Sequence, residues 1–119
     1  MNRYKSLFKN NSSIMLLIDP ENGRIVDAND AALDFYGYDY KSITQKNISE
    51  ITQLTDNELQ EEIANVKHTR EKYFNVIHRL SNGDLKAVEV YTGPIKVEDK
   101  EYLYSIVHDI TEKKNSKKN

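Results

Sequence analysis

Short apolar runs joined by turn residues dominate the start of the chain. Residues 14–18 are continuously apolar, and residues 24–28 follow after a polar segment that contains Pro20 and Gly23. Proline presets one backbone angle of a turn, and glycine accepts the positive φ that a tight loop needs. This pattern predicts two antiparallel strands joined as a β-hairpin.

Helix-start signals dominate the middle of the chain. Asn29 is a suitable N-cap residue, and the spacing of apolar residues predicts a helix over residues 30–36. Short helical pieces are expected after it. Thr55 and Glu58 then have the spacing of a capping box, which predicts a longer helix that ends near Thr69.

Alternating apolar and polar residues predict three further strands. Residues 73–80 and 85–92 alternate, and the Asn-Gly dipeptide between them is a strong hairpin signal. The dipeptide Gly93-Pro94 is expected to bend the chain before a last strand, which includes Tyr102. The order of elements predicts an α+β domain: a five-stranded antiparallel sheet with short helices and one longer helix packed on one face.

Composition and the absence of certain motifs exclude several classes of function. The 119-residue chain is long enough for one domain, and its formal net charge of −2 gives no indication of nucleic-acid binding. The absence of cysteine excludes disulfides, cysteine metal sites and thiol chemistry. No apolar run suits a signal peptide or a membrane span, so a cytoplasmic protein without membrane insertion is expected. No catalytic or phosphate-binding motif is recognisable, which favours a signalling module over an enzyme.

The end of the chain combines a strand with a helix-start signal. Tyr102 and the β-branched residues after it are typical of a half-buried strand. Asp109 can cap an outgoing helix, and Glu112 can reach back to the amide of the cap residue. Loss of this cap is expected to cost about 1 kcal/mol of local stability. A strand that passes directly into a helix suits signal transmission, although the same cap can be purely structural.

Four motifs, taken in order, make the chain resemble a PAS domain. They are DPENGRIVDAN at residues 19–29, the segment 31–38 that ends Phe-Tyr-Gly-Tyr, Leu-Ser-Asn-Gly at residues 80–83, and Asp-Ile-Thr at residues 109–111. The resemblance implies a sheet with strand order 2-1-5-4-3 whose helices close a small pocket. It also implies a sensory module of a larger bacterial signalling protein, often a homodimer. Its output domain in the same polypeptide would be a histidine kinase, a cyclic-di-GMP enzyme or a similar protein.

The resemblance divides the chain into three parts. These are an N-terminal flanking helix at residues 1–12, a sensory domain at residues 13–111 and an output linker at residues 112–119. We expect the domain to sense a small ligand or a partner and to relay the change through its C-terminal junction. The expected junction residues are Asp109, Thr111 and Glu112. The alternative is a ligand-free module for dimerisation or protein interaction.

The resemblance also bears on cofactors. Flavin-binding light sensors of the family need a reactive cysteine in the short-helix region, which here reads Gln-Lys-Asn-Ile-Ser at residues 45–49. Their flavin-contacting polar positions correspond to Val88 and Val107, which cannot hydrogen-bond to a flavin ring. Flavin photochemistry and a cysteine-linked chromophore are therefore excluded. Haem needs an axial ligand, and His68 on the long helix is expected to face solvent, so haem is disfavoured and the cofactor stays unknown.

Strand alternation places one histidine on the inward face. His78 alternates with apolar residues, so we expect it to reach the pocket, where a neutral imidazole can donate or accept a hydrogen bond and respond to pH. The alternative is a core histidine satisfied by a backbone carbonyl or water. His108 is expected on the outer face of the sheet, as a packed or surface residue or as part of an interface. The expected ligand-pocket residues are Phe35, Phe74, Val76, His78, Val88, Val90, Ser105 and Val107.

Aromatic residues indicate an interface. The short amphipathic helix expected over residues 2–10 can pack on its own sheet or on a second copy. Tyrosines on the outer face can form an amphipathic interface patch or simply cover the sheet. The expected interface residues are Tyr4, Leu7, Phe8, Tyr91, Tyr102 and Tyr104. Glu58, Glu61 and Glu62 on the long helix are expected to form a solvated face rather than a metal site.

Overall fold

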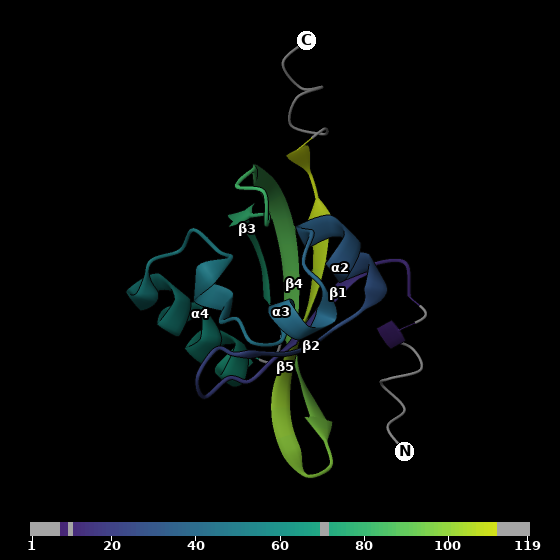
Figure 1. Cartoon of the computed structure of the whole chain (residues 1–119). Helices are drawn as coiled ribbons and strands as arrows, with labels where there is room; N and C mark the ends of the chain where they lie inside the picture. The colour runs from purple at the N-terminus through teal and green to yellow at the C-terminus, as the bar shows by residue number, and fades with distance from the viewer. Residues whose placement is uncertain (1–7, 10, 70–71, 112–119) are drawn as a thin grey trace.

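The computed structural model describes residues 8–9, 11–69 and 72–111. In chain order its elements are β1 (Ile14–Ile18), β2 (Ile25–Ala28), α2 (Asp30–Tyr36), α3 (Tyr40–Ile43), the 3-10 helix η1 (Ile48–Glu50), α4 (Asp56–Thr69), β3 (Lys72–Arg79), β4 (Leu85–Val97) and β5 (Lys100–Asp109) (Figure 1). The predictions that lie outside the described residues are those for Tyr4, Leu7, Glu112 and the side chains of His68 and Phe74.

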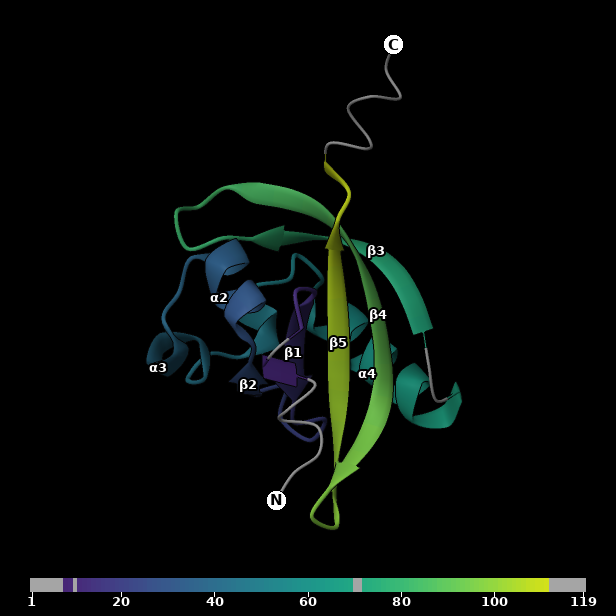
Figure 2. The same cartoon turned by 90° about the vertical axis from the view of Figure 1, so that its right-hand side faces the viewer.

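The strands form one antiparallel sheet in the order β2-β1-β5-β4-β3, which confirms the predicted α+β fold and strand order. β5 pairs with β1 on one side and with β4 on the other. In Figure 2, β5 lies in front and α4 lies behind it, on the opposite face of the sheet. The face of β5 that carries Leu103, Ser105 and Val107 is therefore the inner, helix-covered face, and these three side chains are buried.

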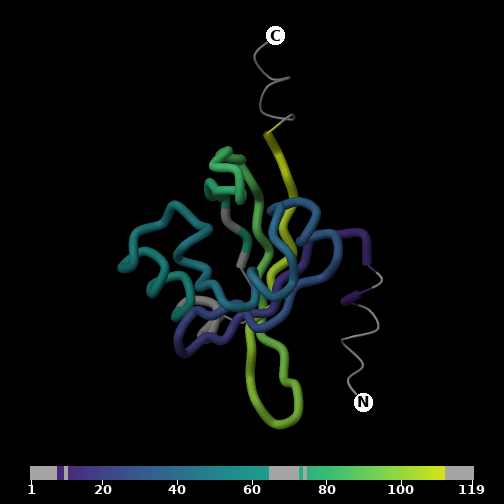
Figure 3. The backbone as a smooth tube through the Cα atoms, viewed as in Figure 1, coloured from purple at the N-terminus to yellow at the C-terminus, as the bar shows by residue number. Residues whose placement is uncertain are grey.

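Strand β4 is longer than the sequence pattern predicted. The expected bend at Gly93-Pro94 is wrong, because β4 continues through both residues, with Pro94 opposite Leu103 on β5. The described pairing of β3 with β4 starts with Lys72 opposite Thr92, so no described residue of β3 lies opposite Pro94. Proline is tolerated at a position where no ladder hydrogen bond is lost. The hairpin of β4 and β5 accordingly projects beyond the rest of the sheet (Figure 3).

The core between the sheet and the helices consists of two buried clusters. The larger cluster joins the sheet to α2, α3 and η1 through residues that include Leu16, Ile18, Ile25, Tyr36, Ile43, Ile48 and Leu103. The smaller cluster is Val88, Val90 and Val107 on β4 and β5. Phe35 and Ile14 pack against both clusters, so the two form a continuous apolar layer.

Asn29 connects the N-terminal segment to the sheet and to α2. The predicted N-cap is confirmed, because its Oδ1 accepts from the amide of Ala32 at 3.0 Å. The same oxygen accepts from the Met15 amide at 3.1 Å, and Nδ2 donates to the carbonyls of Phe8 at 3.0 Å and Ser13 at 2.7 Å. Asn29 is fully buried, so these backbone groups have little access to water as replacement partners.

Replacing Asn29 by alanine should therefore destabilise the domain strongly. We expect Asn29→Ala to lower the free energy of unfolding by about 3 kcal/mol, because it removes a helix cap and leaves buried backbone groups unpaired. Urea denaturation followed by circular dichroism measures this change. Asn22→Ala is the control, since the exposed Asn22 side chain accepts a local bond from the Arg24 amide and caps no helix. Equal losses for the two variants would contradict the assigned role of Asn29.

Candidate functional site

Helix α4 covers the inner face of β4 and begins where the sequence predicts. The Thr55 hydroxyl accepts from the Glu58 amide at 3.1 Å, and the Glu58 carboxylate accepts from the Thr55 amide at 2.9 Å. This reciprocal capping box satisfies backbone donors that the first turn of a helix leaves open. It fixes the start of α4, and Leu59 and Ile63 in the following turns then face the sheet.

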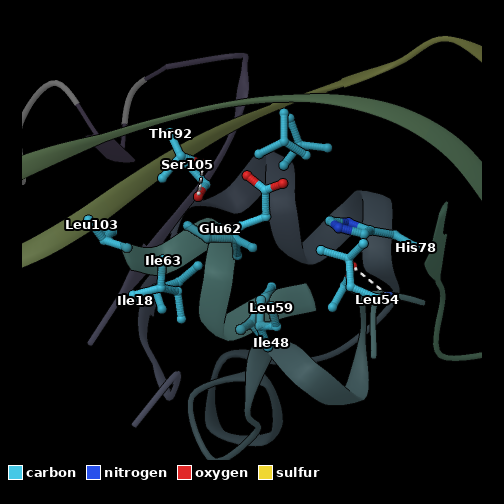
Figure 4. A pocket seen from close by; sticks show the side chains of 14 residues that line it. Ile18, Ile48, Leu54, Leu59, Glu62, Ile63, His78, Thr92, Leu103 and Ser105 are labelled. Atoms are coloured by element: carbon cyan, nitrogen blue, oxygen red, sulfur yellow. Dashed lines mark hydrogen bonds between the residues drawn. The ribbon is translucent and has the colours of Figure 1, made fainter. Parts of the chain in front are cut away.

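A cavity of about 50 Å³ lies between α4 and the sheet (Figure 4). Its walls come from β1 (Leu16, Ile18), from the segment before α4 (Ile48, Thr52, Leu54), from α4 (Leu59, Glu62, Ile63), from β3 (His78), from β4 (Val90, Thr92) and from β5 (Leu103, Ser105, Val107). Most of these side chains are aliphatic. The few polar groups among them decide what the cavity can recognise.

Two hydroxyl groups form one polar position on the sheet side of the cavity. Thr92 on β4 and Ser105 on β5 are directly opposite in the register, and their hydroxyl oxygens are 3.0 Å apart. Both residues are buried. One hydroxyl donates to the other, and the pair still has lone pairs that can accept a hydrogen bond from a ligand.

His78 is a second polar position, and it is engaged by the protein. Its side chain is 3% exposed, and Nδ1 lies 2.8 Å from the hydroxyl of Tyr36 at the end of α2. Burial lowers the pKa of His78 to about 4, so the imidazole is neutral at neutral pH. Burial also raises the pKa of Tyr36, which keeps its hydroxyl protonated. The expected alternatives for a core histidine were a backbone carbonyl or water, whereas the structure supplies a tyrosine hydroxyl.

Glu62 is a third polar position, and the sequence interpretation placed it wrongly. Glu58 and Glu61 are exposed as predicted, but Oε1 of Glu62 is buried and its carboxylate points into the cavity between Ser105 and His78 (Figure 4). Glu62 follows Leu59 by three residues, and side chains three apart on a helix share a face. That spacing was the signal in the sequence that could have identified it.

The remaining predicted pocket residues divide between the cavity and its surroundings. Val90, Ser105 and Val107 line the cavity together with His78. Phe35, Val76 and Val88 do not line this cavity, because they pack in the adjoining cluster of β4 and β5. Tyr36, which the sequence interpretation placed only within the predicted helix over residues 30–36, is the residue that hydrogen-bonds to the histidine.

The strand that lines the cavity ends at the predicted junction. Asp109 Oδ1 accepts from the amide of Thr111 at 2.9 Å, a bond of the kind that an N-cap residue makes. The Thr111 hydroxyl lies 3.1 Å from the Ala87 amide, which donates to it, and 3.3 Å from the Ala87 carbonyl. The Ile110 amide also donates to that carbonyl at 3.0 Å. The junction is therefore attached to β4 at Ala87.

The outer face of the sheet carries a row of tyrosines. The ring of Tyr91 on β4 lies 4.8 Å from that of Tyr73 and 6.1 Å from that of Tyr104, between ring centroids. Tyr102 lies on the same face of β5, where the Lys100 ammonium is 5.5 Å from its ring centroid. Phe8, another predicted interface residue, is 3% exposed within its own chain. Exposed His108 shares the outer face.

The described part of the chain contains neither a candidate metal site nor a helix that could cross a membrane. No group of three or more histidine and acidic side chains could hold a metal ion there. In the same residues, no helix has the length and apolar character needed to cross a membrane.

The burial of His78 makes stability depend on pH. An unfolded histidine binds a proton near pH 6.5, whereas His78 in the folded domain does so near pH 4. The unfolded state therefore binds more protons between these values, and stability should fall by about 3 kcal/mol as pH drops from 6.5 to 4. Urea denaturation over this pH range measures the slope. His78→Gln should reduce it and His108→Gln, at an exposed position, should not; a slope unaffected by His78→Gln would contradict this origin.

Solved structures of different proteins have the same fold as this chain. The PAS domain of an HTR-like protein from Haloarcula marismortui has a TM-score of 0.80 at 22% identity and covers 91% of this chain and 89% of its own. A Rhodobacter sphaeroides LOV (light-oxygen-voltage) protein has a TM-score of 0.77 at 17% identity and covers 98% of this chain and 72% of its own. At these identities the likeness shows the fold alone.

The cavity of this chain does not fit a flavin, the cofactor of the light-sensing branch. Its volume of about 50 Å³ is well below the ~300 Å³ at which pockets for larger organic ligands begin. Val107, which the family resemblance aligns with a flavin-contacting position, is a buried apolar side chain that lines the cavity.

Two relatives are similar to this chain in amino-acid sequence. The diguanylate cyclase DgcM of Escherichia coli O157:H7 is 43% identical over 114 residues, and DgcM of strain K12 is 42% identical. These matches cover 93% of this chain, but the chain spans only 28% of the length of either relative. The family model of the PAS domain matches residues 11–112. This chain therefore belongs to the PAS domain family.

Proposed function

We propose that this PAS sensory module binds a small molecule in the cavity under α4 and relays its presence to an output domain in the same polypeptide. One observation carries the proposal: β5 lines the cavity with Leu103, Ser105 and Val107 and reaches the junction four residues later at Thr111. Because β5 both lines the cavity and leads into the junction, a change at the cavity wall can be transmitted along this strand to the junction.

The relay would use both central strands. Thr92 of β4 and Ser105 of β5 face the cavity as a hydrogen-bonded pair, and Ala87 of β4 holds Thr111. A ligand that binds one relative position of the strands better than another would shift the balance between two junction arrangements. Asp109 and Thr111 would transmit this change, together with Glu112 in the linker that follows. The domain itself would be non-catalytic.

The attached output would be an enzyme of cyclic-di-GMP metabolism or a histidine kinase. The similarity to DgcM, described as a diguanylate cyclase, supports the first choice. A PAS domain from a two-component sensor histidine kinase has a TM-score of 0.76 at 16% identity, so the same fold also occurs with the second kind of output. The cytosolic setting expected from the sequence stays a prediction.

A ligand-free dimerisation module is the second candidate function. The row of Tyr73, Tyr91 and Tyr104 favours it, because tyrosines supply apolar contact area together with a hydroxyl that can pair across an interface. Tyr73 is 65% exposed, so a large aromatic side chain is available on this face. If the domain is a dimerisation module, the cavity would bind no ligand and the outer face of the sheet would bind a second copy of the chain.

Native mass spectrometry of the freshly purified chain tests the two candidates. We expect a mass excess that disappears on denaturation, because a cavity with buried polar groups is stabilised by a matching ligand. The released compound can then be identified by its mass. A dimer without any bound compound would contradict ligand sensing and support the dimerisation module. A variant with a filled cavity, Ile63→Phe, is the control and should carry no bound compound.

A further inference from the structure

The hydrogen bond between Tyr36 and His78 determines which nitrogen of the imidazole carries the proton. Because burial lowers the pKa of His78 to about 4, the ring has a single proton at neutral pH. The Tyr36 hydroxyl is fully buried, and its one hydrogen bond among the described residues is to Nδ1 of His78. If Nδ1 were protonated, the tyrosine O–H would be a buried donor without an acceptor, which costs free energy. The hydroxyl therefore donates to Nδ1, and the ring proton is on Nε2.

The Nε2–H group of His78 is available to a ligand. Figure 4 shows the imidazole ring pointing from β3 into the cavity, and Nε2 belongs to the end of the ring that is far from the backbone. The two ring nitrogens direct their hydrogen bonds to different sides, so Nε2 cannot use the Tyr36 hydroxyl as well. In the part of the chain that the structure describes, the imidazole has no second hydrogen-bond partner. A ligand that accepts this bond pairs a donor that is otherwise buried.

The other polar groups of the cavity impose less on a ligand than His78 does. The Thr92–Ser105 pair lies on the opposite side of the cavity from His78 (Figure 4). Its two hydroxyls share one hydrogen bond, so the pair can both donate and accept and adapts to either kind of ligand group. Glu62 already has an interaction within the chain, so it is assigned no role toward the ligand. The donor of His78 is therefore the group that selects.

Charge and shape limit the rest of the ligand. None of the described residues that line the cavity is lysine or arginine, so a buried anion would find no positive side chain there. An ammonium group has donors only and cannot accept from His78. Leu59, Ile63, Ile18 and Leu103 supply apolar walls, and a volume of about 50 Å³ holds a few water-sized groups, at ~10–15 Å³ for each. The ligand should therefore be compact, aliphatic and uncharged.

We infer that the cavity binds a small neutral aliphatic molecule through a carbonyl oxygen that accepts the Nε2–H hydrogen bond of His78, a donor that Tyr36 positions. This inference rests on the proposed function, since it names the ligand class of the same cavity. A carbonyl oxygen accepts a hydrogen bond and brings no donor of its own. An alcohol brings an O–H that His78 cannot accept, because Nδ1 is already engaged by Tyr36.

The ring nitrogens of His78 test the role of Tyr36 directly. Two-bond ¹H–¹⁵N correlation spectra of the ¹⁵N-labelled full chain at pH 7 distinguish a protonated ring nitrogen from an unprotonated one, and we expect the proton on Nε2. Tyr36→Phe should move the Nδ1 resonance away from that of a protonated nitrogen, because a donor is lost. Tyr38→Phe removes a hydroxyl two residues away and should leave it unchanged. A proton on Nδ1, or an Nδ1 resonance insensitive to Tyr36→Phe, would overturn the inference.

Three probes with one carbon skeleton test the ligand class: 3-methylbutan-2-one, 3-methylbutan-2-ol and 3-methylbutan-2-amine. Each is titrated into the ¹⁵N-labelled full chain at pH 7, and the amide shifts of the lining residues give the dissociation constants. We expect the ketone to bind about threefold more tightly than the alcohol, as one neutral hydrogen bond should allow, and about tenfold or more tightly than the amine, which is charged at this pH.

Two leucine variants isolate the donor. His78→Leu should abolish the preference for the ketone over the alcohol, and the ratio of the two dissociation constants cancels a change in cavity size. His108→Leu is the matched control, because it removes an imidazole from the exposed outer face and should leave the ratio unchanged. The amide spectrum of each variant reports whether it is folded. The comparison of the three probes on the unsubstituted chain needs no variant.

The contrary outcomes separate this inference from the proposed function. If the alcohol or the amine binds at least as tightly as the ketone, or if His78→Leu keeps the preference, the carbonyl assignment is overturned while a ligand-binding cavity stands. If no probe shifts the lining residues, the carbonyl assignment is likewise overturned. The compound released in native mass spectrometry then decides the proposed function independently.

Discussion

The pairing of β5 between β1 and β4 is the constraint on which the rest of the structure depends. Its position fixes both neighbours in register, so the inner side chains of three strands form one wall of the cavity. The outer side chains of the same strands carry the tyrosine row. Beyond its last paired residue the chain is tied back to Ala87 through Ile110 and Thr111. Cavity, outer face and exit are thus all connected through β5.

Polar groups inside this apolar layer are arranged in different ways. Thr92 and Ser105 share one hydrogen bond, and Nδ1 of His78 is paired with the Tyr36 hydroxyl, so each of these buried residues has a partner within the protein. The Glu62 carboxylate projects from helix α4 into the same cavity.

Local signals in the sequence predicted much of this fold. The cap that Asn29 makes with the Ala32 amide and the capping box of Thr55 and Glu58 act through neighbours within a few residues, so a short window of sequence is enough to predict them. The strand order came from the family resemblance. Sequence reasoning failed where distant residues decide: Pro94 lies in β4 opposite Leu103 of β5, and the partner of His78 is a tyrosine 42 residues away.

Amide hydrogen exchange at the junction tests most directly whether cavity and exit are coupled. Ile63→Phe places a larger side chain in the cavity and mimics occupancy, whereas Val97→Phe places the same side chain at the far end of β4, outside the cavity. The account predicts that Ile63→Phe changes the exchange rate of the Ile110 amide, which donates to Ala87, and that Val97→Phe does not. An Ile110 rate unchanged by Ile63→Phe, with changes confined to the cavity walls, would contradict the coupling.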